Sequence, residues 1–345
     1  ALGSPRISFA CPPNPFRVDR IEKWPLKDRI RLIVPLYFFK FYKGATMVYH
    51  LFLWLTVCFW GVSFVATKVV VMVFPPFFAA ILRFLIAWVF LWLFTRRKAY
   101  GKRKDLVFAG LWGVTLYFVF ENLGMVYTLP TNAVLIISLV PLLNLLYLSL
   151  FRKQRLTILQ VAGAAIAFAG VCVVFLNGNI NLRLNPLGDL LIFASAISWV
   201  VYTHYILQVE REKPAGSADA LAVTRALTGW GVLFLIPFTA LESLFGRAHW
   251  SLDALGWPFF AGLLFLSVCC SSIGFYLWNM AIRHLGPRYT TNTLYVMPIV
   301  TGVAEAVILR SIPNRYTLIG AFFVLLGLYI SEQKKHTVKG ISPSK

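Results

Sequence analysis

Apolar stretches of about 20 residues follow one another along most of this 345-residue chain, from Val48 to Ile330. Each is long enough to cross a hydrocarbon layer about 30 Å thick as a helix that rises about 1.5 Å per residue. The stretches are apolar on all sides, whereas a membrane strand alternates apolar and polar residues. The pattern predicts ten transmembrane α-helices, at residues 50–72, 77–95, 105–126, 131–151, 157–176, 187–208, 218–242, 256–282, 289–309 and 316–331.

Charged residues are rare and lie mainly between the apolar stretches. They make up 13% of the chain, although the net charge is +20. Of the 33 Lys and Arg residues, 26 lie on the side of the N-terminus, four lie on the opposite side and three lie within spans. Because basic loops stay in the cytoplasm, we expect a multi-pass protein of the plasma or inner cell membrane with both termini cytoplasmic. The basic loops are placed to face anionic lipid, so we expect no nucleic-acid partner.

Four residues of one half of the chain recur in the other half at a constant offset of 157 residues. Pro130, Pro141, Gly163 and Gly170 correspond to Pro287, Pro298, Gly320 and Gly327. The fold class predicted is therefore an all-α integral membrane protein of two five-helix repeats, residues 50–176 and 187–331. Because five is odd, the second repeat enters the membrane from the opposite side, an arrangement found in secondary transporters.

The repeated residue types have physical roles inside a membrane. Glycines seven positions apart lie on one helix face and let another helix approach closely, so plain packing is the favoured interpretation of the glycine pairs. Pro141 and Pro298 bend or interrupt their helices. Two interpretations remain open for these prolines, a kink that serves packing or a helix break that lines a cavity.

The two ends of the chain differ from the spans. Residues 1–46 are basic and precede Met47, and their apolar piece Leu32–Tyr42 is too short to cross a membrane. We expect this segment to be disordered or not natively translated, with a segment that lies on the membrane surface as the alternative. Residues 332–345 are expected to form a basic cytoplasmic tail.

The ordered set of motifs resembles the drug/metabolite transporter superfamily, and within it the EamA-type permeases with two EamA domains. The resemblance covers residues 50–331 and implies a ten-helix permease that exports or exchanges metabolites, amino acids or drugs. The family usually has a glutamate nine residues before the first glycine of each half's last span, where this chain has Gln154 and Ser311. The motifs are Phe59-Trp60-Gly61-Val62-Ser63-Phe64, Arg83-Phe84, Phe120-Glu121-Asn122-Leu123-Gly124-Met125-Val126-Tyr127-Thr128, Pro141, Gly163, Ala169-Gly170-Val171, Gly188-Asp189-Leu190-Leu191, Ser198-Trp199, Pro298, Gly320 and Gly327.

Five ionisable residues fall within the predicted spans. Such residues cost on the order of 2.5–3.5 kcal/mol at the centre of a membrane helix and usually face a partner or water. The topology places Lys68, Arg83, Glu121 and Glu305 at one depth, about 6–9 Å inside the outer boundary. We hypothesise a partly hydrated cluster in which Glu121 exchanges a proton or contacts a cationic solute. The alternatives are static ion pairs and side chains that reach the interface, and Arg83 and Arg225 are interpreted as more structural.

Polar and aromatic residues within the spans are further candidates for the substrate or ion pathway. The resemblance places near the centre Trp60, Ser63, Asn122, Trp199, Tyr202, Asn279 and Tyr295. Packing, or an aromatic belt at the interface, remains the alternative for each of them.

The motifs that other functional classes need are not found in this sequence. The five cysteines have no metal-site spacing, the five histidines are scattered, and no glycine-rich Lys-Ser/Thr phosphate loop occurs. We expect no metal, no cofactor and no enzymatic activity. The function predicted is secondary transport of a small metabolite, amino acid or drug-like solute by alternating access, with or without coupling to protons. The alternative is a lipid flippase or a non-transporting membrane scaffold. The expected partners are a small-molecule substrate and the lipid bilayer. The chain is expected to be a monomer or a homodimer.

Overall fold

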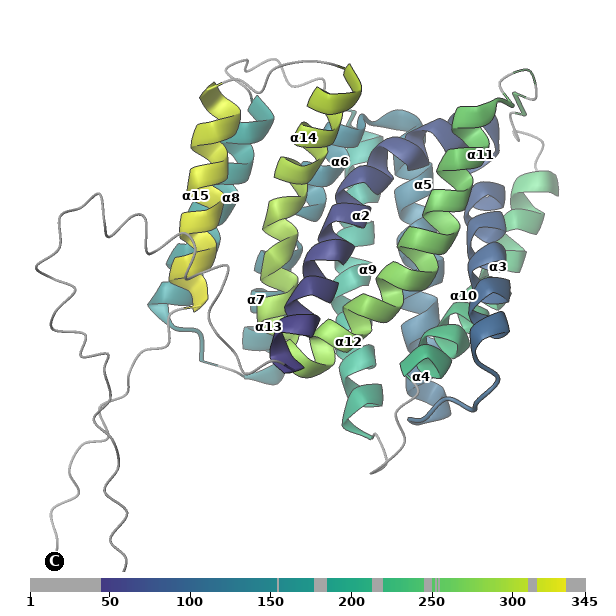
Figure 1. The fold of residues 1–345 in the computed structure, drawn as a ribbon, viewed down its shortest axis with the longest axis horizontal. Coiled ribbons are helices and arrows are strands. Elements are labelled where there is room, and N and C mark those ends of the chain that lie inside the picture. The colour runs from purple at the N-terminus through teal and green to yellow at the C-terminus, as the bar shows by residue number, and fades with distance from the viewer. Residues whose placement is uncertain are drawn as a thin grey trace, which may run out of the picture. The chain divides into compact units, whose positions relative to one another are not determined.

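The structure, a computed structural model, describes residues 45–153, 155–176, 185–212, 220–244, 250–251, 253, 255–309 and 315–332. This part of the chain is a bundle of helices (Figure 1). The first half contains α2 Ala45–Val73, α3 Pro76–Phe94, α4 Arg103–Gly110, η2 Leu111–Leu116, α5 Tyr117–Tyr127, α6 Pro130–Ile137, α7 Val140–Arg152 and α8 Ile158–Leu176. The second half contains α9 Pro186–Arg211, α10 Ala220–Leu244, α11 Trp257–Leu264, η4 Phe265–Gly274, α12 Phe275–Leu285, α13 Pro287–Asn292, η5 Thr293–Val296, α14 Met297–Leu309 and α15 Arg315–Glu332.

Helical segments lie at all ten predicted spans. Among the described residues, seven helices are long and apolar enough to cross a membrane, and two shorter apolar helices cover the fifth and tenth predicted spans. The ninth predicted span is divided into α13, the 3₁₀-helix η5 and α14. The protein is a multi-pass helical membrane protein, while ten spans in an inverted repeat stay a prediction. The predicted tails up to residue 44 and from residue 333 lie outside the described residues.

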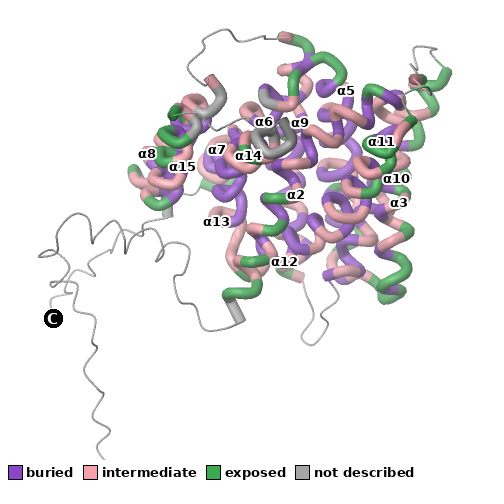
Figure 2. Tube along the Cα trace, turned by 45° about the horizontal axis from the view of Figure 1, so that its top comes forward, coloured by how far each residue is buried: buried purple, intermediate pink, exposed green. Residues whose placement is uncertain are grey.

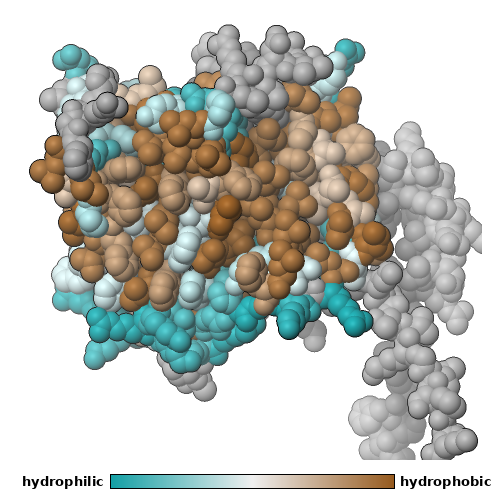
Figure 3. Space-filling model, turned by 180° about the vertical axis from the view of Figure 1, so that it is seen from behind, coloured by the Kyte–Doolittle hydropathy of each residue, from teal (hydrophilic) through white to brown (hydrophobic). Residues whose placement is uncertain are grey.

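The surface and the interior of the bundle have the polarity expected of a protein in lipid. Large apolar side chains such as Leu93, Phe94, Leu150 and Phe151 are between 65% and 73% exposed. An apolar band covers the middle of the molecule, and hydrophilic residues gather along one end (Figure 3). Buried residues line the inner sides of the helices (Figure 2). Because water would disfavour so large an apolar exterior, the band is the surface that faces the hydrocarbon layer.

Most of the described cations lie at the end of the bundle that carries the start of α4 and the ends of α3, α7, α9 and α12. We call this end the basic face, and its residues include Arg96, Arg97, Lys98, Lys102, Arg103, Lys104, Arg152, Lys153, Arg155, Arg211, Arg283 and Arg288. It is the end that the charge count predicts to be cytoplasmic.

Ionic contacts on the basic face join the two halves of the chain. Lys102 Nζ lies 2.5 Å from Glu212 Oε1, and the hydrogen bond and charge of Lys102 lower the pKa of the Glu212 carboxyl. Tyr100 donates a hydrogen bond of 2.9 Å to Glu210, and Arg283 Nε lies 3.6 Å from the same carboxylate. The turn between α3 and α4 is thereby held against the ends of α9 and α12.

Helices α8 and α15, the last helices of the two halves, pack directly against each other. A Cβ on Gly163 would lie 2.6 Å from the Gly327 carbonyl oxygen, and one on Gly327 would lie 2.5 Å from the Gly163 carbonyl oxygen. A Cβ on Gly170 would lie 2.7 Å from the Gly320 carbonyl oxygen. The repeated glycines therefore face one another across a close backbone contact, which confirms the packing role predicted for them.

We expect Gly163→Ala and Gly327→Ala to lower the melting temperature of the detergent-purified protein. An added methyl group must push apart two backbones, and overpacking of this kind costs about 1–3 kcal/mol. The matched control is Gly302→Ala in α14, where an added Cβ has no described neighbour within 4 Å. Equal melting temperatures for the three variants would contradict a close contact of α8 and α15.

Helices of corresponding position in the two halves depart from regular α-geometry. The third helix of each half contains a π-helical segment, η2 in the first and η4 in the second. The fourth helix of the first half is interrupted at Ser138 and Leu139, and that of the second passes through η5. Pro141 and Pro298 lie in the first turn of the helix that restarts after the interruption, where a proline breaks no intrahelical hydrogen bond. Regular α-helical hydrogen bonding is thus interrupted at related places in the two halves.

Candidate functional site

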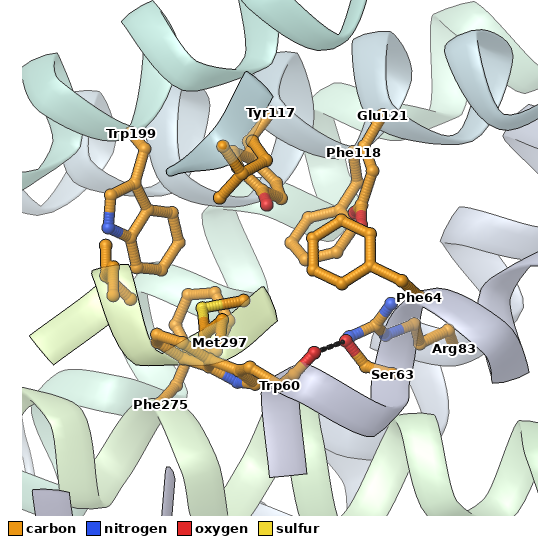
Figure 4. A pocket seen from close by; sticks show the side chains of 12 residues that line it. Trp60, Ser63, Phe64, Arg83, Tyr117, Phe118, Glu121, Trp199, Phe275 and Met297 are labelled. Carbon is orange, nitrogen blue, oxygen red and sulfur yellow. Dashed lines mark hydrogen bonds between the residues drawn. The ribbon is translucent and has the colours of Figure 1, made fainter. Parts of the chain in front are cut away.

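A small cavity of about 30 Å³ lies between the two halves of the chain. Its lining comes from α2, α3, α5 and α6 of the first half and from α9, α12, η5 and α14 of the second (Figure 4). The side chains that surround it are those of Trp60, Ser63, Phe64, Arg83, Tyr117, Phe118, Glu121, Ile137, Trp199, Phe275, Leu294 and Met297. Five of the predicted pathway and charge residues are therefore brought to one place, namely Trp60, Ser63, Arg83, Glu121 and Trp199.

Aromatic rings form one wall of the cavity. The rings of Trp60 and Trp199, which occupy corresponding first helices of the two halves, have centroids 5.1 Å apart and meet edge to face. Tyr117 packs against Trp199 at 5.1 Å. Trp60 Nε1 donates a hydrogen bond to the Cys270 carbonyl oxygen, whereas Trp199 Nε1 has no partner among the described residues. The Ser63 hydroxyl donates to the Trp60 carbonyl oxygen at 2.8 Å, the bond drawn in Figure 4.

Arg83 brings a buried positive charge to the cavity. Its side chain is 3% exposed, and its Nε donates a hydrogen bond of 2.7 Å to the Ser271 hydroxyl. The guanidinium carbon lies 4.5 Å from the centre of the Phe118 ring, a cation–π contact that is favourable in a desolvated site. No carboxylate among the described side chains lies within ion-pair distance of Arg83. Arg83 therefore borders the cavity without an ion-pair partner among the described residues.

Glu121 brings a carboxyl group to the same cavity. It is 2% exposed, and its Oε2 atom has no hydrogen-bond partner among the described residues. A buried polar atom without a partner is uncommon in folded proteins and calls for a water or a ligand. Figure 4 shows Glu121 and Arg83 on the same side of the cavity. The adjacent Asn122 does not line it, and its Nδ2 donates to the Pro76 carbonyl oxygen at 2.9 Å.

Lys68 does not join these two residues as the predicted cluster requires. Its Nζ donates hydrogen bonds to the carbonyl oxygens of Met125 and Thr128, at 2.5 and 3.1 Å. These carbonyls lie at and just beyond the C-terminus of α5, where the helix leaves acceptors unpaired and its dipole favours a positive charge. In this structure Lys68 is a helix cap rather than a partner of Glu121.

Arg225, which lies in the second helix of the second half as Arg83 lies in that of the first, also caps a helix. Its Nη1 donates to the Thr95 carbonyl oxygen at 2.6 Å and its Nη2 to the Arg97 carbonyl oxygen at 2.8 Å, at the end of α3. The structural role preferred for Arg225 agrees with these contacts, while Arg83 borders the cavity. The side chain of Glu305 lies outside the described part of the structure, so only Arg83 and Glu121 of the predicted cluster are seen together.

Tyr202, Asn279 and Tyr295 are not part of the cavity lining, although the Tyr202 ring packs on Trp199 and Phe275 behind it. Tyr202 donates a hydrogen bond of 2.6 Å to Asn279 Oδ1, and Asn279 Nδ2 donates to the Thr224 hydroxyl at 3.2 Å. The three side chains connect α9, α12 and α10 in a buried network. Tyr295 is 1% exposed in η5, and its hydroxyl has no partner among the described residues.

Several lining residues are missing from the sequence prediction. Tyr117 and Phe118 lie four and three positions before Glu121, a spacing that places all three on one helix face. This signal could have identified them. Phe275, Leu294 and Met297 carry no such signal, because an apolar residue in a span faces lipid, a neighbouring helix or a cavity according to the rotation of its helix.

We expect Tyr202→Phe to destabilise the protein by about 1–3 kcal/mol, because it leaves the buried Asn279 oxygen without a donor. The ring and its packing are retained, and the cavity lining is unchanged. A thermal melt in detergent measures the loss, with Tyr295→Phe, whose buried hydroxyl has no partner among the described residues, as the paired comparison. A melting temperature equal to that of the wild type would contradict the network.

The apolar exterior, the helical bundle and a cavity between its halves that holds two buried ionisable side chains are features of a multi-pass membrane transporter. Comparison with known proteins agrees, since the model of the EamA-like transporter family matches residues 47–176 and 186–332. The chain belongs to the EamA-like transporter family.

Related proteins carry transporter names. Two proteins of Archaeoglobus fulgidus, each named an uncharacterized transporter, are 28% and 31% identical over 83% and 81% of this chain and 98% and 97% of their own. A protein of Streptantibioticus cattleyicolor named "probable terminal-alkyne amino-acid exporter" is 26% identical over 66% of this chain and 73% of its own. A solved crystal structure has the same fold, with a TM-score of 0.64, 21% identity and coverage of 82% of this chain and 95% of that one.

Proposed function

We propose that the protein is a secondary transporter that moves a small amino-acid-like solute across the membrane by alternating access, with the cavity between its halves as the central binding site. The observation that carries this proposal is the buried Glu121 carboxyl, whose Oε2 atom has no partner among the described residues and lies in a cavity that Arg83 also lines. A buried charge inside a membrane protein is costly and is retained where it has a function.

The chemistry of the cavity fits a solute with both an ammonium and a carboxylate group. Glu121 can accept hydrogen bonds from an ammonium group or take up a proton, and Arg83 can donate to a carboxylate. Trp60, Trp199 and Phe275 provide aromatic surface for an apolar side chain. The exporter name of the Streptantibioticus relative also refers to an amino acid, which supports this choice over other small metabolites.

Binding of such a solute requires the cavity to enlarge. A volume of about 30 Å³ accommodates a water molecule but not an amino acid. Ile137, Leu294 and Met297 line the cavity from the two interrupted helices, and these interruptions are places where short segments can move without breaking long runs of hydrogen bonds. The proposed opening therefore rotates α6 and η5 away from the aromatic wall, alternately toward the two sides of the membrane.

We expect Glu121→Gln to reduce uptake into reconstituted vesicles by at least about tenfold and to remove its dependence on a proton gradient. The amide cannot exchange a proton and pairs weakly with an ammonium group. Uptake of labelled neutral amino acids and of cationic drugs, with and without an imposed pH difference, measures the effect. The matched control is Glu242→Gln, because Glu242 accepts hydrogen bonds from the Phe77 and Phe78 N–H groups outside the cavity.

Two outcomes contradict this proposal. If the Glu121→Gln protein shows the rate and the pH dependence of the wild type, Glu121 has no role in proton coupling. If the wild type moves none of these solutes but scrambles phospholipid between leaflets, the protein is a flippase.

We expect Arg83→Lys to raise the KM for a carboxylate-bearing solute about tenfold with a smaller effect on the maximal rate. A lysine ammonium lacks the planar fork that contacts Ser271 and the Phe118 ring together with a substrate carboxylate. The comparison is made with the amino acid and with its uncharged amide, whose KM should change little. Equal changes in KM for both compounds would mean that Arg83 supports the cavity without contacting the solute carboxylate.

A further inference from the structure

A second and larger cavity opens at the basic face. Its volume is about 620 Å³, within the range of about 300–1,000 Å³ typical of small-molecule sites. It lies between α7, the start of α8, the last turns of α9 and the turn from α12 to α13. We call it the vestibule. None of the pathway residues predicted from the sequence lies in its lining.

The vestibule is lined by positive charge. Arg152, Arg155, Arg211 and Arg288 contribute to its wall, and the described lining contains no carboxylate. Arg152, Arg155 and Arg211 form no ion pair with a described carboxylate. Like charges around one hollow repel each other, so an anion that enters relieves this repulsion.

Two arginines of the vestibule, Arg152 and Arg211, lie near one histidine of its wall. Arg152 Nη2 lies 2.8 Å from His204 Nδ1, and the charges of both Arg152 and Arg211 act on the same imidazole ring. Tyr147 also packs on this ring, with centroids 5.5 Å apart. The buried Asp105 acts on His204 from α4, but it does not line the vestibule. The positive side chains are thereby gathered around a polar and aromatic wall.

The inner end of the vestibule adjoins the central cavity. Thr203 lines the vestibule and Trp199 lines the central cavity, one helical turn apart on α9. Asn144, also in the vestibule wall, donates a hydrogen bond of 3.3 Å to the Thr291 hydroxyl and so connects α7 to α13. The two cavities therefore meet neighbouring turns of α9.

Retention of basic loops in the cytoplasm explains why cations are numerous on this face. It does not explain why four arginines surround one hollow while Lys98 and Arg96 lie outside it. Arginine presents a planar fork of N–H donors that matches the oxygens of a carboxylate or a phosphate. We propose that the vestibule is a second binding site, which captures the carboxylate or phosphate group of an anionic molecule at the basic face.

Only the role of the vestibule in this inference rests on the proposed transport function, namely that it holds a solute before the solute enters the central cavity. Anion binding itself is measured without transport. The probe is radiolabelled inorganic phosphate, bound to the purified full-length protein in nanodiscs of phosphatidylcholine at constant ionic strength. The variants are Arg155→Gln, Arg211→Gln and the double variant, with Lys98→Gln as the control that removes one charge from the same face outside the vestibule.

We expect saturable phosphate binding to the wild type. The Kd should rise at least about tenfold in the double variant and change less than about twofold in Lys98→Gln, because a hydrogen bond to a charged group contributes more to binding than a distant surface charge. Arg155→Lys and Arg211→Lys should recover part of the affinity. Melting temperatures of all proteins, measured in parallel, establish that the variants are folded.

A second set of nanodiscs containing phosphatidylglycerol distinguishes the two sources of the anionic group. If this lipid displaces phosphate from the wild type but not from the arginine variants, the site binds a lipid headgroup. If phosphate binding is the same in both kinds of nanodisc, the site binds a free solute. Absence of saturable binding, or equal affinities in the double variant and Lys98→Gln, overturns the proposal. Uptake assays on the same preparations test the central site separately, since phosphate binding without amino-acid uptake contradicts only the transport proposal.

Discussion

The structure depends on one constraint, that backbone N–H and C=O groups within hydrocarbon must find partners inside the protein. Regular helices satisfy this requirement for most of the described chain. The interruption at Ser138 and Leu139 and the 3₁₀-helix η5 border the central cavity, where irregular backbone is shielded from lipid. The same requirement explains why Pro141 and Pro298 stand where helices restart. Helix breaks and the candidate site thus have a common physical origin.

Ionisable side chains in the bundle fall into two groups under this constraint. Lys68 and Arg225 donate to main-chain carbonyls at helix ends, so they complete the backbone hydrogen bonding. Arg83 and Glu121 instead lie beside a cavity, and Glu121 retains an oxygen without a partner. Only the second group leaves bonding capacity for a solute. The distinction depends on what each side chain contacts, because all four residues lie within predicted spans.

The two halves meet through residues of corresponding position. The repeated glycines bring α8 and α15 together, because Gly163 packs on Gly327 and Gly170 packs on Gly320. Trp60 and Trp199, from the first helix of each half, meet beside the cavity. Similar sequence does not impose a similar environment, because Arg83 faces the cavity while Arg225, in the corresponding helix of the second half, faces the end of α3. On the basic face, the contact of Lys102 with Glu212 and that of Tyr100 with Glu210 join the halves.

The sequence by itself determined that the protein is a helical membrane protein of the EamA type, where its helices lie, and that its paired glycines pack closely. These properties follow from the hydropathy of whole stretches and from the spacing of residues within one helix. Neither depends on how the helices rotate about their axes. Tertiary structure alone decided which charges share a cavity. In the folded protein Lys68 does not contact Glu121, and Tyr202 and Asn279 belong to a buried hydrogen-bond network outside the lining. Tyr117 and Phe275, which the sequence did not single out, line the cavity. Tertiary structure also gathered arginines from distant segments around the vestibule, because contacts between residues far apart in the chain arise only when helix faces meet.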